Sequence, residues 1–181
     1  AMHLSGISTY TNNLVSKLKG TKINLADTRK TTPGLRKLEK YAFKCGGGIN
    51  HRMGLYDAAM IKENHIAWSN NLKDCVKKIR LNTPFTTHII IEVENINQAK
   101  DAVLAGADSI LLDEIEPKIL RNNIDSLREI FEKNSKEIII EVSGIKPEAI
   151  NDYLIEGIDL ISTSSSVTKS NWIDLSMRYI N

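Results

Sequence analysis

The stretch from residue 87 to residue 142 decides the fold, because three short apolar segments alternate there with two helical ones. The apolar segments read THIIIEV at 87–93, SILLD at 109–113 and EIIIEV at 137–142. Between them, residues 96–104 and 117–133 have the apolar spacing of helices, and Pro117 stands in a first turn. Strands that are apolar along their whole length are typical of parallel sheets covered on both faces. The stretch therefore predicts consecutive β/α units of a parallel sheet.

The same alternation continues towards both ends of the chain. Further strands are predicted at 22–28, 58–62 and 159–162, and further helices at 4–19, 35–43, 66–81, 147–155 and 172–179. These segments make about six β/α units, whereas a closed eight-unit barrel usually needs roughly 250 residues. We therefore predict one α/β domain over residues 1–181, a parallel β/α barrel that is incomplete or open.

Composition and charge exclude several classes of protein. The chain has 24 Lys and Arg residues against 22 Asp and Glu residues, and this net charge of +2 is too small for a strong electrostatic grip on nucleic acid. Its apolar runs are too short to span a membrane, and its two cysteines are too few for a disulfide framework. The first residues lack the features of a signal peptide. We expect a cytoplasmic protein with neither nucleic-acid nor membrane partners.

Charged and small polar residues gather where the predicted strands end, which is where parallel β/α folds carry their reactive groups. The cationic set comprises Arg29, Lys30, His51, Arg52 and Lys62. The acidic set comprises Glu92 and Asp113, with Glu94 and Glu141 nearby. Two segments of small residues, Ser143-Gly144 and Ser162–Ser166, are suited to holding a phosphate on backbone N–H groups. Cations, carboxylates and a phosphate loop together predict a polyanionic substrate bound with a magnesium ion.

A simpler interpretation exists for each residue of these sets. A charged residue at a strand end is usually part of the solvated rim. Lys62 is harder to dismiss in this way, because it follows an apolar strand and an unpaired buried ammonium group is costly. Its simpler interpretation is a buried ion pair with Glu92 or Asp113. No Cys/His spacing in the chain is typical of a zinc site.

Several motifs, in order along almost the whole chain, are those of one enzyme family. They read LSGIST at 4–9, DTRKTTPGLR at 27–36, KCGGGINHRMGLYD at 44–57, IKENHI at 61–66, IEVEN at 91–95 and LLD at 111–113. The chain resembles nicotinate-nucleotide pyrophosphorylase (carboxylating), also called quinolinate phosphoribosyltransferase. The resemblance implies a pentosyltransferase of de novo NAD biosynthesis. It would convert quinolinate and phosphoribosyl pyrophosphate to nicotinate mononucleotide, CO₂ and pyrophosphate, with Mg²⁺.

The resemblance also implies roles for individual residues. By motif position, the quinolinate carboxylates would be held by Arg29, His51, Arg52 and Lys62; phosphoribosyl pyrophosphate and its metal would be faced by Lys30, Glu92 and Asp113; and the 5′-phosphate would be held by Ser143, Gly144, Ser164 and Ser165. Lys62, Glu92 and Asp113 would act in catalysis. The two carboxylates would reach magnesium indirectly, through the metal-bound pyrophosphate.

The chain departs from the family pattern in three places. The family has a separate N-terminal domain before the motif at 4–9, which packs against the barrel of a partner subunit, and we expect this chain to lack that domain. A homodimer or higher homo-oligomer is implied. Ile145 follows Ser143-Gly144 where the family has Gly or Asn, and Ser164–Ser166 with Lys169 replace a family glycine and histidine.

Three alternative functions stay open at this point. The first is a related phosphoribosyltransferase that acts on another ring, and the second is a non-catalytic ligand-binding homologue. The third is a Schiff-base lyase on a β/α barrel, with Lys62 as the amine.

Overall fold

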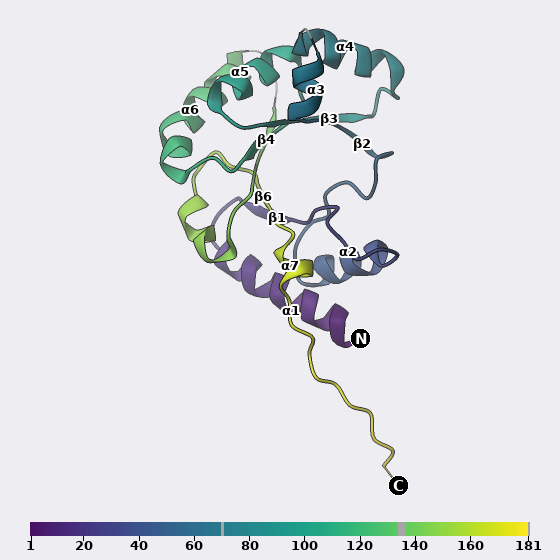
Figure 1. Cartoon of the computed structure of the whole chain (residues 1–181). Helices are drawn as coiled ribbons and strands as arrows, with labels where there is room; N and C mark the ends of the chain where they lie inside the picture. Colours follow the sequence, from purple (N-terminus) through teal and green to yellow (C-terminus); the bar gives the residue numbers. More distant parts are fainter. Residues whose placement is uncertain (70, 134–136, 181) are drawn as a thin grey trace.

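In the computed structural model, residues 1–69, 71–133 and 137–180 are described. One parallel sheet has six strands, in the order β1-β6-β5-β4-β3-β2. These are β1 (Asn24–Ala26), β2 (Ala58–Ile61), β3 (His88–Val93), β4 (Ser109–Asp113), β5 (Ile139–Ser143) and β6 (Leu160–Ser162). The strands curve around a common interior, and β1 and β2 form the two unpaired edges (Figure 1). The prediction of an open parallel β/α barrel is confirmed.

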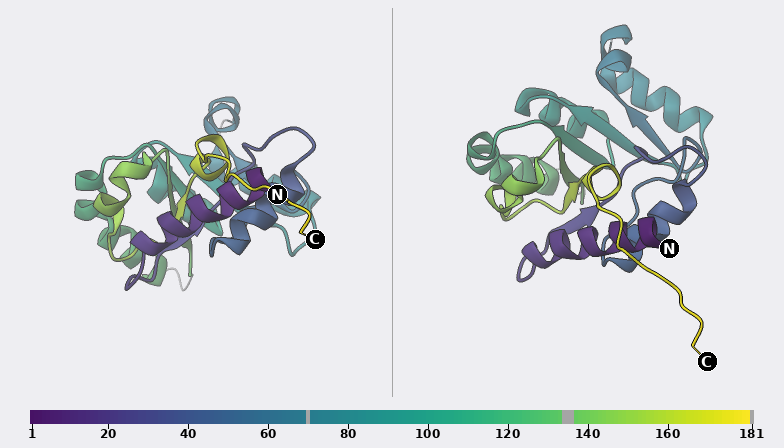
Figure 2. Two further views of the ribbon diagram at one scale, coloured as in Figure 1. Left: turned by 90° about the horizontal axis from the view of Figure 1, so that it is seen from below. Right: turned by 60° about the horizontal axis from the view of Figure 1, so that its bottom comes forward.

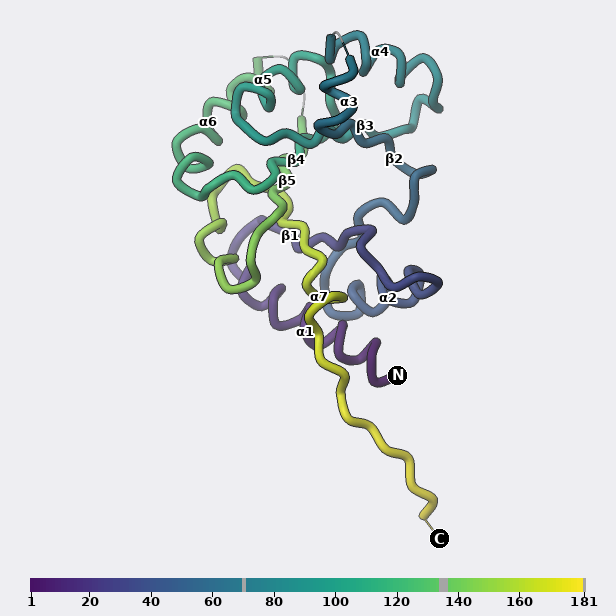
Figure 3. Tube along the Cα trace, viewed as in Figure 1, coloured from purple at the N-terminus to yellow at the C-terminus, as the bar shows by residue number. Residues whose placement is uncertain are grey.

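The helices lie outside the curved sheet (Figure 1, Figure 3). They are α1 (Met2–Lys17), α2 (Arg36–Cys45), α3 (Glu63–Trp68), α4 (Leu72–Asn82), α5 (Ile96–Ala105), α6 (Pro117–Lys133), the 3₁₀ helix η1 (Pro147–Tyr153) and α7 (Ser165–Thr168). Helices α1 and α2 pack side by side, and the last residues run away from the barrel as an extended segment (Figure 2). Among the described residues, no helix is long and apolar enough to cross a membrane.

Alternation along the strands separates the outer core from the barrel interior. Ile89, Ile91 and Ile110 are completely buried in the main core, together with apolar residues of the helices. Ile90 and Leu111 belong to a separate small cluster, which includes Met60 of β2. Because successive strand residues point to opposite faces, this alternation also places Lys62, Glu92, Asp113 and Glu141 on the inner side, near the carboxyl ends of the strands.

The open side of the barrel is bordered by the segment between α2 and β2. Ile49 makes a single parallel bridge to Ala26 of β1. The Ile49 N–H donates to the Leu25 carbonyl at 2.8 Å, and the Ile49 carbonyl accepts from the Asp27 N–H at 3.2 Å. Gly48 packs directly on Phe43, whose ring would lie 2.1 Å from an added Cβ. The glycine run at 46–48 is therefore required in part by close packing.

Three predicted helices differ from those observed. The helix predicted at 66–81 is two helices, α3 and α4; Asn71 caps the second by accepting from the Lys73 N–H at 2.9 Å, and position 70 lies outside the described residues. The segment predicted as a helix at 147–155 is the 3₁₀ helix η1. The helix predicted at 172–179 is wrong, because this segment has no helical residue.

The last of these errors has a physical reason. Most of the apolar residues that suggested the helix are exposed, from 50% for Leu175 to 99% for Met177. A short helix gains most of its stability by packing an apolar face against a core. Only the start of this segment contacts α1: the Trp172 ring lies 5.9 Å from the His3 ring, and the Ile173 N–H donates to the Met2 carbonyl at 3.2 Å. The apolar residues after Ile173 are exposed, and the segment stays extended.

Candidate active site

One cleft of about 600 Å³ opens at the carboxyl ends of the strands. The cleft is lined by most of the residues that the sequence placed in the site: Arg29, Lys30, His51, Arg52, Lys62, Glu92, Asp113, Ser143, Gly144, Ser164 and Ser165. Glu94 and Ser166 do not line it. The carboxyl ends of all six strands contribute to this lining or lie directly beside it. The structure thus brings the cationic set, the two acidic residues and the two serine-containing segments together.

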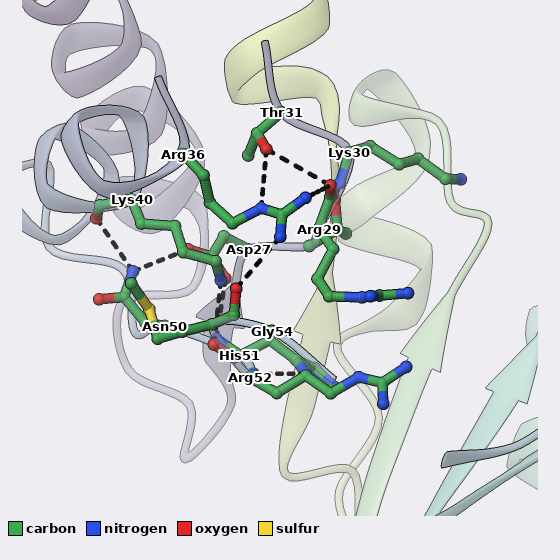
Figure 4. Close-up of polar contacts among 12 residues, drawn as sticks. Asp27, Arg29, Lys30, Thr31, Arg36, Lys40, Asn50, His51, Arg52 and Gly54 are labelled. Atoms are coloured by element: carbon green, nitrogen blue, oxygen red, sulfur yellow. Dashed lines mark hydrogen bonds and ion pairs between the residues drawn. The ribbon is translucent and has the colours of Figure 1, made fainter. Parts of the chain in front are cut away.

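Two arginines form one wall of the cleft. The side chains of Arg29 and Arg52 extend the same way, away from the buried residues around Lys40 (Figure 4). Arg52 donates to the Ala58 carbonyl at 3.0 Å and contacts the Met60 sulfur at 3.3 Å. Burial and the nearby positive charge of Arg29 lower the pKa of Arg52, while Asp57 and Glu92 oppose that effect. Two neighbouring cations in a partly dry cleft favour the binding of an anion between them.

A buried ion pair supports this wall from behind. Lys40, which is 1% exposed, pairs with Asp27 and donates to the His51 carbonyl at 2.9 Å. Asp27 also accepts from Asn50 Nδ2 at 2.7 Å and from the His51 N–H at 2.8 Å. Burial raises the pKa of Asp27, and Lys40, Asn50 and His51 pull it back. This network ties the end of β1 to the residues that precede Arg52.

The loop that carries Arg29 and Lys30 is fixed by α2. Arg36 donates to Thr31 Oγ1 at 3.0 Å and to the Arg29 carbonyl at 3.3 Å, and Glu39 accepts from the Thr32 N–H at 2.9 Å. Within the described part of the chain, the charged ends of Arg29 and Lys30 have no hydrogen bond or ion pair. Both side chains are therefore available to a ligand in the cleft.

The acidic residues lie on the neighbouring strands β3 and β4. Glu92 pairs with Lys62 at 2.5 Å between Oε2 and Nζ, so Glu92 is the partner that one of the simpler interpretations gave to Lys62. The pair is not buried as that interpretation expected, because the Lys62 side chain is 41% exposed. Asp113 accepts a hydrogen bond from Ser143 Oγ of β5. Glu94 lies past the end of β3, is exposed and does not line the cleft.

His51 bridges the cleft to the acidic side. Its Nε2 lies 3.2 Å from Oε2 of Glu141 on β5, and its Nδ1 accepts from the Arg52 N–H at 2.7 Å. The sequence placed Glu141 only near the acidic set. Its inward position follows from the strand period that relates it to Ser143.

The serine-rich loops form the remaining wall. Ser165 donates its N–H to Thr163 Oγ1 at 3.1 Å, at the start of α7. Gly144 has φ +75°, and an added Cβ would lie 2.5 Å from Cγ of Glu114, which itself has φ 52°. Both residues hold left-handed backbone conformations where the ends of β4 and β5 meet, so this corner of the cleft is tightly built.

Sequence reasoning missed some lining residues. The cleft is also lined by Arg36, Met60, Glu114, Lys146 and Lys169. The position of Lys146 two residues after Gly144, in a loop that follows a strand, is a signal that could have identified it. Met60 carries no such signal, because an apolar residue within a strand reads as core.

Two carboxylates of the cleft are of the kind that could contact a metal ion together with a substrate. Among the residues that the structure describes, no three His, Cys, Asp or Glu side chains gather as a metal site. Magnesium in phosphate-binding enzymes usually takes one or two carboxylates together with substrate phosphates and water. Glu92 and Asp113 fit that donor set, and their carboxylates line the same cleft as the cations.

Comparison with known proteins points to one family. The chain matches the family described as "Quinolinate phosphoribosyl transferase, C-terminal domain" over residues 7–178. It is 40% identical over 179 residues to the probable nicotinate-nucleotide pyrophosphorylase (carboxylating) of Methanothermobacter thermautotrophicus, covering 97% of this chain and 63% of that protein. For the protein of the same name from a Synechocystis species, the identity is 37% over 180 residues, with 99% and 60% covered.

Solved structures agree with the sequence comparison. The crystal structure of NadC from Streptococcus pyogenes superposes with a TM-score of 0.88 at 36% identity, covering 98% of this chain and 61% of that one. The nicotinate-nucleotide pyrophosphorylase from Francisella tularensis gives a TM-score of 0.86 at 37% identity, with 97% and 60% covered. The chain thus spans about three fifths of the length of these relatives. Both the sequence and the architecture show that the chain belongs to the quinolinate phosphoribosyl transferase C-terminal domain family.

Proposed function

We propose that this chain is the barrel domain of a nicotinate-nucleotide pyrophosphorylase (carboxylating). It would transfer the phosphoribosyl group of phosphoribosyl pyrophosphate to quinolinate and release CO₂ and pyrophosphate, forming nicotinate mononucleotide. The observation that carries the proposal is one cleft lined by two arginines, Arg29 and Arg52, and by two carboxylates, Glu92 and Asp113. The arginines suit an aromatic dianion, and the carboxylates suit a reacting sugar with a metal-bound leaving group.

The arginine wall would hold quinolinate. A guanidinium group binds a carboxylate through two parallel hydrogen bonds, a geometry that an ammonium group cannot offer. The guanidinium group of Arg29 has no hydrogen bond or ion pair within the described part of the chain, and Arg52 is anchored at Ala58 with the charge of Arg29 beside it. A bound dianion would relieve the repulsion between the two cations, and Lys62 would add a third positive charge.

The carboxylates would act on the ribosyl side. Displacement at the anomeric carbon passes through an oxocarbenium-like transition state, by analogy with glycoside chemistry. Glu92 or Asp113 would stabilise the positive charge that develops there. Lys30, whose ammonium group has no partner among the described residues, would face the pyrophosphate. Bound magnesium, reached by Glu92 and Asp113 through the pyrophosphate, would neutralise the charge of the leaving group.

The serine-rich wall would hold the 5′-phosphate of the sugar. Ser143, Gly144, Ser164 and Ser165 line the cleft, and small residues of this kind hold a phosphate through backbone N–H groups and hydroxyls. The Ser165 N–H and the Ser143 hydroxyl would exchange their present bonds to Thr163 and Asp113 for bonds to the phosphate. Lys146 and Lys169 line the same side and would supply positive charge.

Decarboxylation would complete the reaction once the ring nitrogen carries the ribosyl group. The bond between the ring carbon next to that nitrogen and its carboxylate breaks, and CO₂ leaves. The electron pair stays on the ring carbon, where the positive ring nitrogen stabilises it, until a proton from water neutralises it. No protein base is needed for this step.

The structure argues against the Schiff-base alternative. Lys62 Nζ lies 2.5 Å from Glu92 Oε2, so the amine is engaged with a carboxylate. A Schiff base requires a free amine that can attack a carbonyl carbon.

We also propose that the protein is cytoplasmic and forms a homodimer or higher homo-oligomer. Both cysteines are free thiols, which suits a reducing compartment. Exposed apolar residues on α2 and after it support self-association: Leu38 is 51% exposed, Tyr41 66% and Leu55 75%. Analytical ultracentrifugation of the natural protein would test this, and a monomer at micromolar concentration would contradict it.

The function is tested by product analysis with quinolinate labelled in the carboxyl group next to the ring nitrogen. The purified protein, phosphoribosyl pyrophosphate and Mg²⁺ should yield one labelled CO₂ for each nicotinate mononucleotide formed. Nicotinate in place of quinolinate should give no product. Turnover with nicotinate or another ring but not with quinolinate would identify a different phosphoribosyltransferase. Binding of quinolinate without turnover would identify a non-catalytic homologue.

A further inference from the structure

Glu39 is a carboxylate buried between two helices and the loop that carries Arg29 and Lys30. Its side chain, on α2, has no exposed surface. Oε2 accepts from the Thr32 N–H at 2.9 Å, and Oε1 lies 2.8 Å from Nε2 of His3 on α1. Burial raises the pKa of Glu39, but the hydrogen bonds from Thr32 and His3 lower it by more, so the group is ionised near neutral pH.

His3 holds the other side of this carboxylate. An ionised carboxylate only accepts, so the hydrogen between the two groups belongs to Nε2 of the imidazole. The His3 ring lies 5.9 Å from the ring of Trp172, and within the described part of the chain its Nδ1 is buried without a partner. Burying such a pair destabilises a fold compared with apolar residues of similar size. Stability therefore does not explain the pair, whereas the contact of Glu39 with the loop does.

Within the described residues, side chains of α2 tie this loop to the rest of the domain. The N–H groups of Lys30 and Thr31 bond at 3.0 Å to atoms of the loop itself. Arg36 of α2 donates to Thr31 Oγ1 at 3.0 Å and to the Arg29 carbonyl at 3.3 Å (Figure 4). Glu39 lies three residues further along α2, on the same face, and holds a backbone N–H of the loop. The place of the two cations thus depends on both contacts.

We propose that Glu39 is a positioning residue, which His3 holds in place and which fixes the loop so that Arg29 and Lys30 stand at the substrate cleft. This inference rests on the proposed function in that the ligands of the two cations are quinolinate and phosphoribosyl pyrophosphate. Glu39 and His3 do not line the cleft, so they act through the loop. The charged ends of Arg29 and Lys30 have no partner within the described part of the chain, so the backbone of the loop decides where they stand.

The first test is backbone hydrogen exchange measured by NMR, which requires no substrate. In Glu39→Met the Thr32 N–H loses its acceptor and should exchange about tenfold faster or more than in the natural protein. Glu39→Gln keeps an oxygen for Thr32 and offers an amide N–H to His3, so the rate should stay within about threefold. The control Glu132→Met, at an exposed glutamate on α6, should change nothing in the loop. An unchanged Thr32 rate in Glu39→Met would overturn the proposal.

The second test separates positioning from folding by steady-state kinetics. Glu39→Met should raise the KM of both substrates by about tenfold or more, since small displacements of binding groups are costly. Its kcat should stay within about threefold, because Glu92 and Asp113 are undisturbed. A variant that is merely less folded loses kcat in proportion to its folded fraction and keeps its KM. Glu39→Gln should keep both KM values within about threefold of those of the natural protein.

Natural KM values in Glu39→Met would refute the positioning role, as would a Glu39→Gln variant with KM values as high as those of Glu39→Met. Thermal denaturation shows whether each variant is folded. If Glu39→Met is not, His3→Leu decides the matter: it removes one partner of Glu39 and should raise both KM values by about threefold or more, and natural values would refute the proposal. Failure of the natural protein to turn over quinolinate would refute the proposed substrate, and the exchange of the Thr32 N–H would still decide whether Glu39 holds the loop.

Discussion

Replacing Lys40 by Met removes the cation that supports the arginine wall, and we expect a large loss of stability. Lys40 is 1% exposed, pairs with Asp27 and donates to the His51 carbonyl at 2.9 Å. Methionine fills a similar volume without a charge, so the Asp27 carboxylate is left buried with only the neutral donors of Asn50 and His51. Breaking a buried ion pair by removing one partner costs about 3–5 kcal/mol.

The pKa of Asp27 gives this loss a pH dependence. Burial raises that pKa above its ordinary value of 3.8, while Lys40 is the foremost group that lowers it again. Stability linked to a raised carboxyl pKa is present below the ordinary value and is lost as the pH rises through the folded value. Without Lys40 the folded pKa of Asp27 rises further. The loss in Lys40→Met should therefore be small in acid and reach its full size near neutral pH.

Urea denaturation followed by circular dichroism, at about pH 4 and about pH 7, measures both effects. Lys37→Met, an exposed lysine on the same helix, is the matched control and should change the stability by less than about 0.5 kcal/mol. The double variant Asp27→Asn/Lys40→Met should be at least about 1 kcal/mol more stable than Lys40→Met at neutral pH, because no charge is left unpaired. A loss below about 1 kcal/mol in Lys40→Met, or one equal at both pH values, would refute this reasoning.

Five further variants probe the cleft and the frame of the barrel. Arg29→Ala should lower kcat/KM for quinolinate by an amount that corresponds to about 2–4 kcal/mol of transition-state stabilisation, and a lysine at position 29 should restore only part of it. A near-normal kcat/KM in Arg29→Ala would remove Arg29 from the dianion site. Glu92→Gln and Asp113→Asn should keep quinolinate affinity in calorimetry while turnover falls by about 10²-fold or more, and lost affinity with normal turnover would reverse their roles. Glu114→Asn should raise the stability by about 0.5–1 kcal/mol, since Asn tolerates the left-handed backbone at φ 52° better; a lower melting temperature would contradict this. Asp108→Asn should lower the stability by about 1 kcal/mol near neutral pH and by nothing in strong acid. Burial raises the pKa of Asp108, but the contact with Arg80 and the other hydrogen bonds lower it by more, so the stability that Asp108 contributes is lost as the pH falls. A loss of stability in Asp108→Asn that persists in acid would contradict this.

Much of the fold could be predicted because the strand pattern is local. Ile89–Ile91 and Ile110–Leu112 are buried on both faces of the sheet, and such strands are apolar along their length whichever strands they pair with. The inner positions followed from the period of two, and the carboxyl ends of parallel strands meet at one edge. For this reason Arg29, Lys62, Glu92 and Asp113 could be assigned to one site before any coordinates were known. Their roles in the reaction stay predictions.

The errors lie where packing overrides local pattern. The apolar spacing at 172–179 predicted a helix, but the apolar residues after Ile173 stay exposed and the segment is extended. The single helix expected at 66–81 is interrupted because Asn71 caps a new one. Spacing alone does not show whether a partner surface exists or where a capping side chain turns.

The sequence by itself determined the parallel β/α class, the open barrel and most of the charged residues that line the cleft. Each of these depends on strand period, strand count or strand ends, which are properties of neighbouring residues. Only the tertiary structure decided which of those residues touch. His51 and Glu141 are 90 positions apart, and Lys40 reaches Asp27 from a helix across a turn. Such partners are set by the curvature of the sheet and the register of its strands, which bring distant residues to within about 3 Å of each other and which no short stretch of sequence encodes.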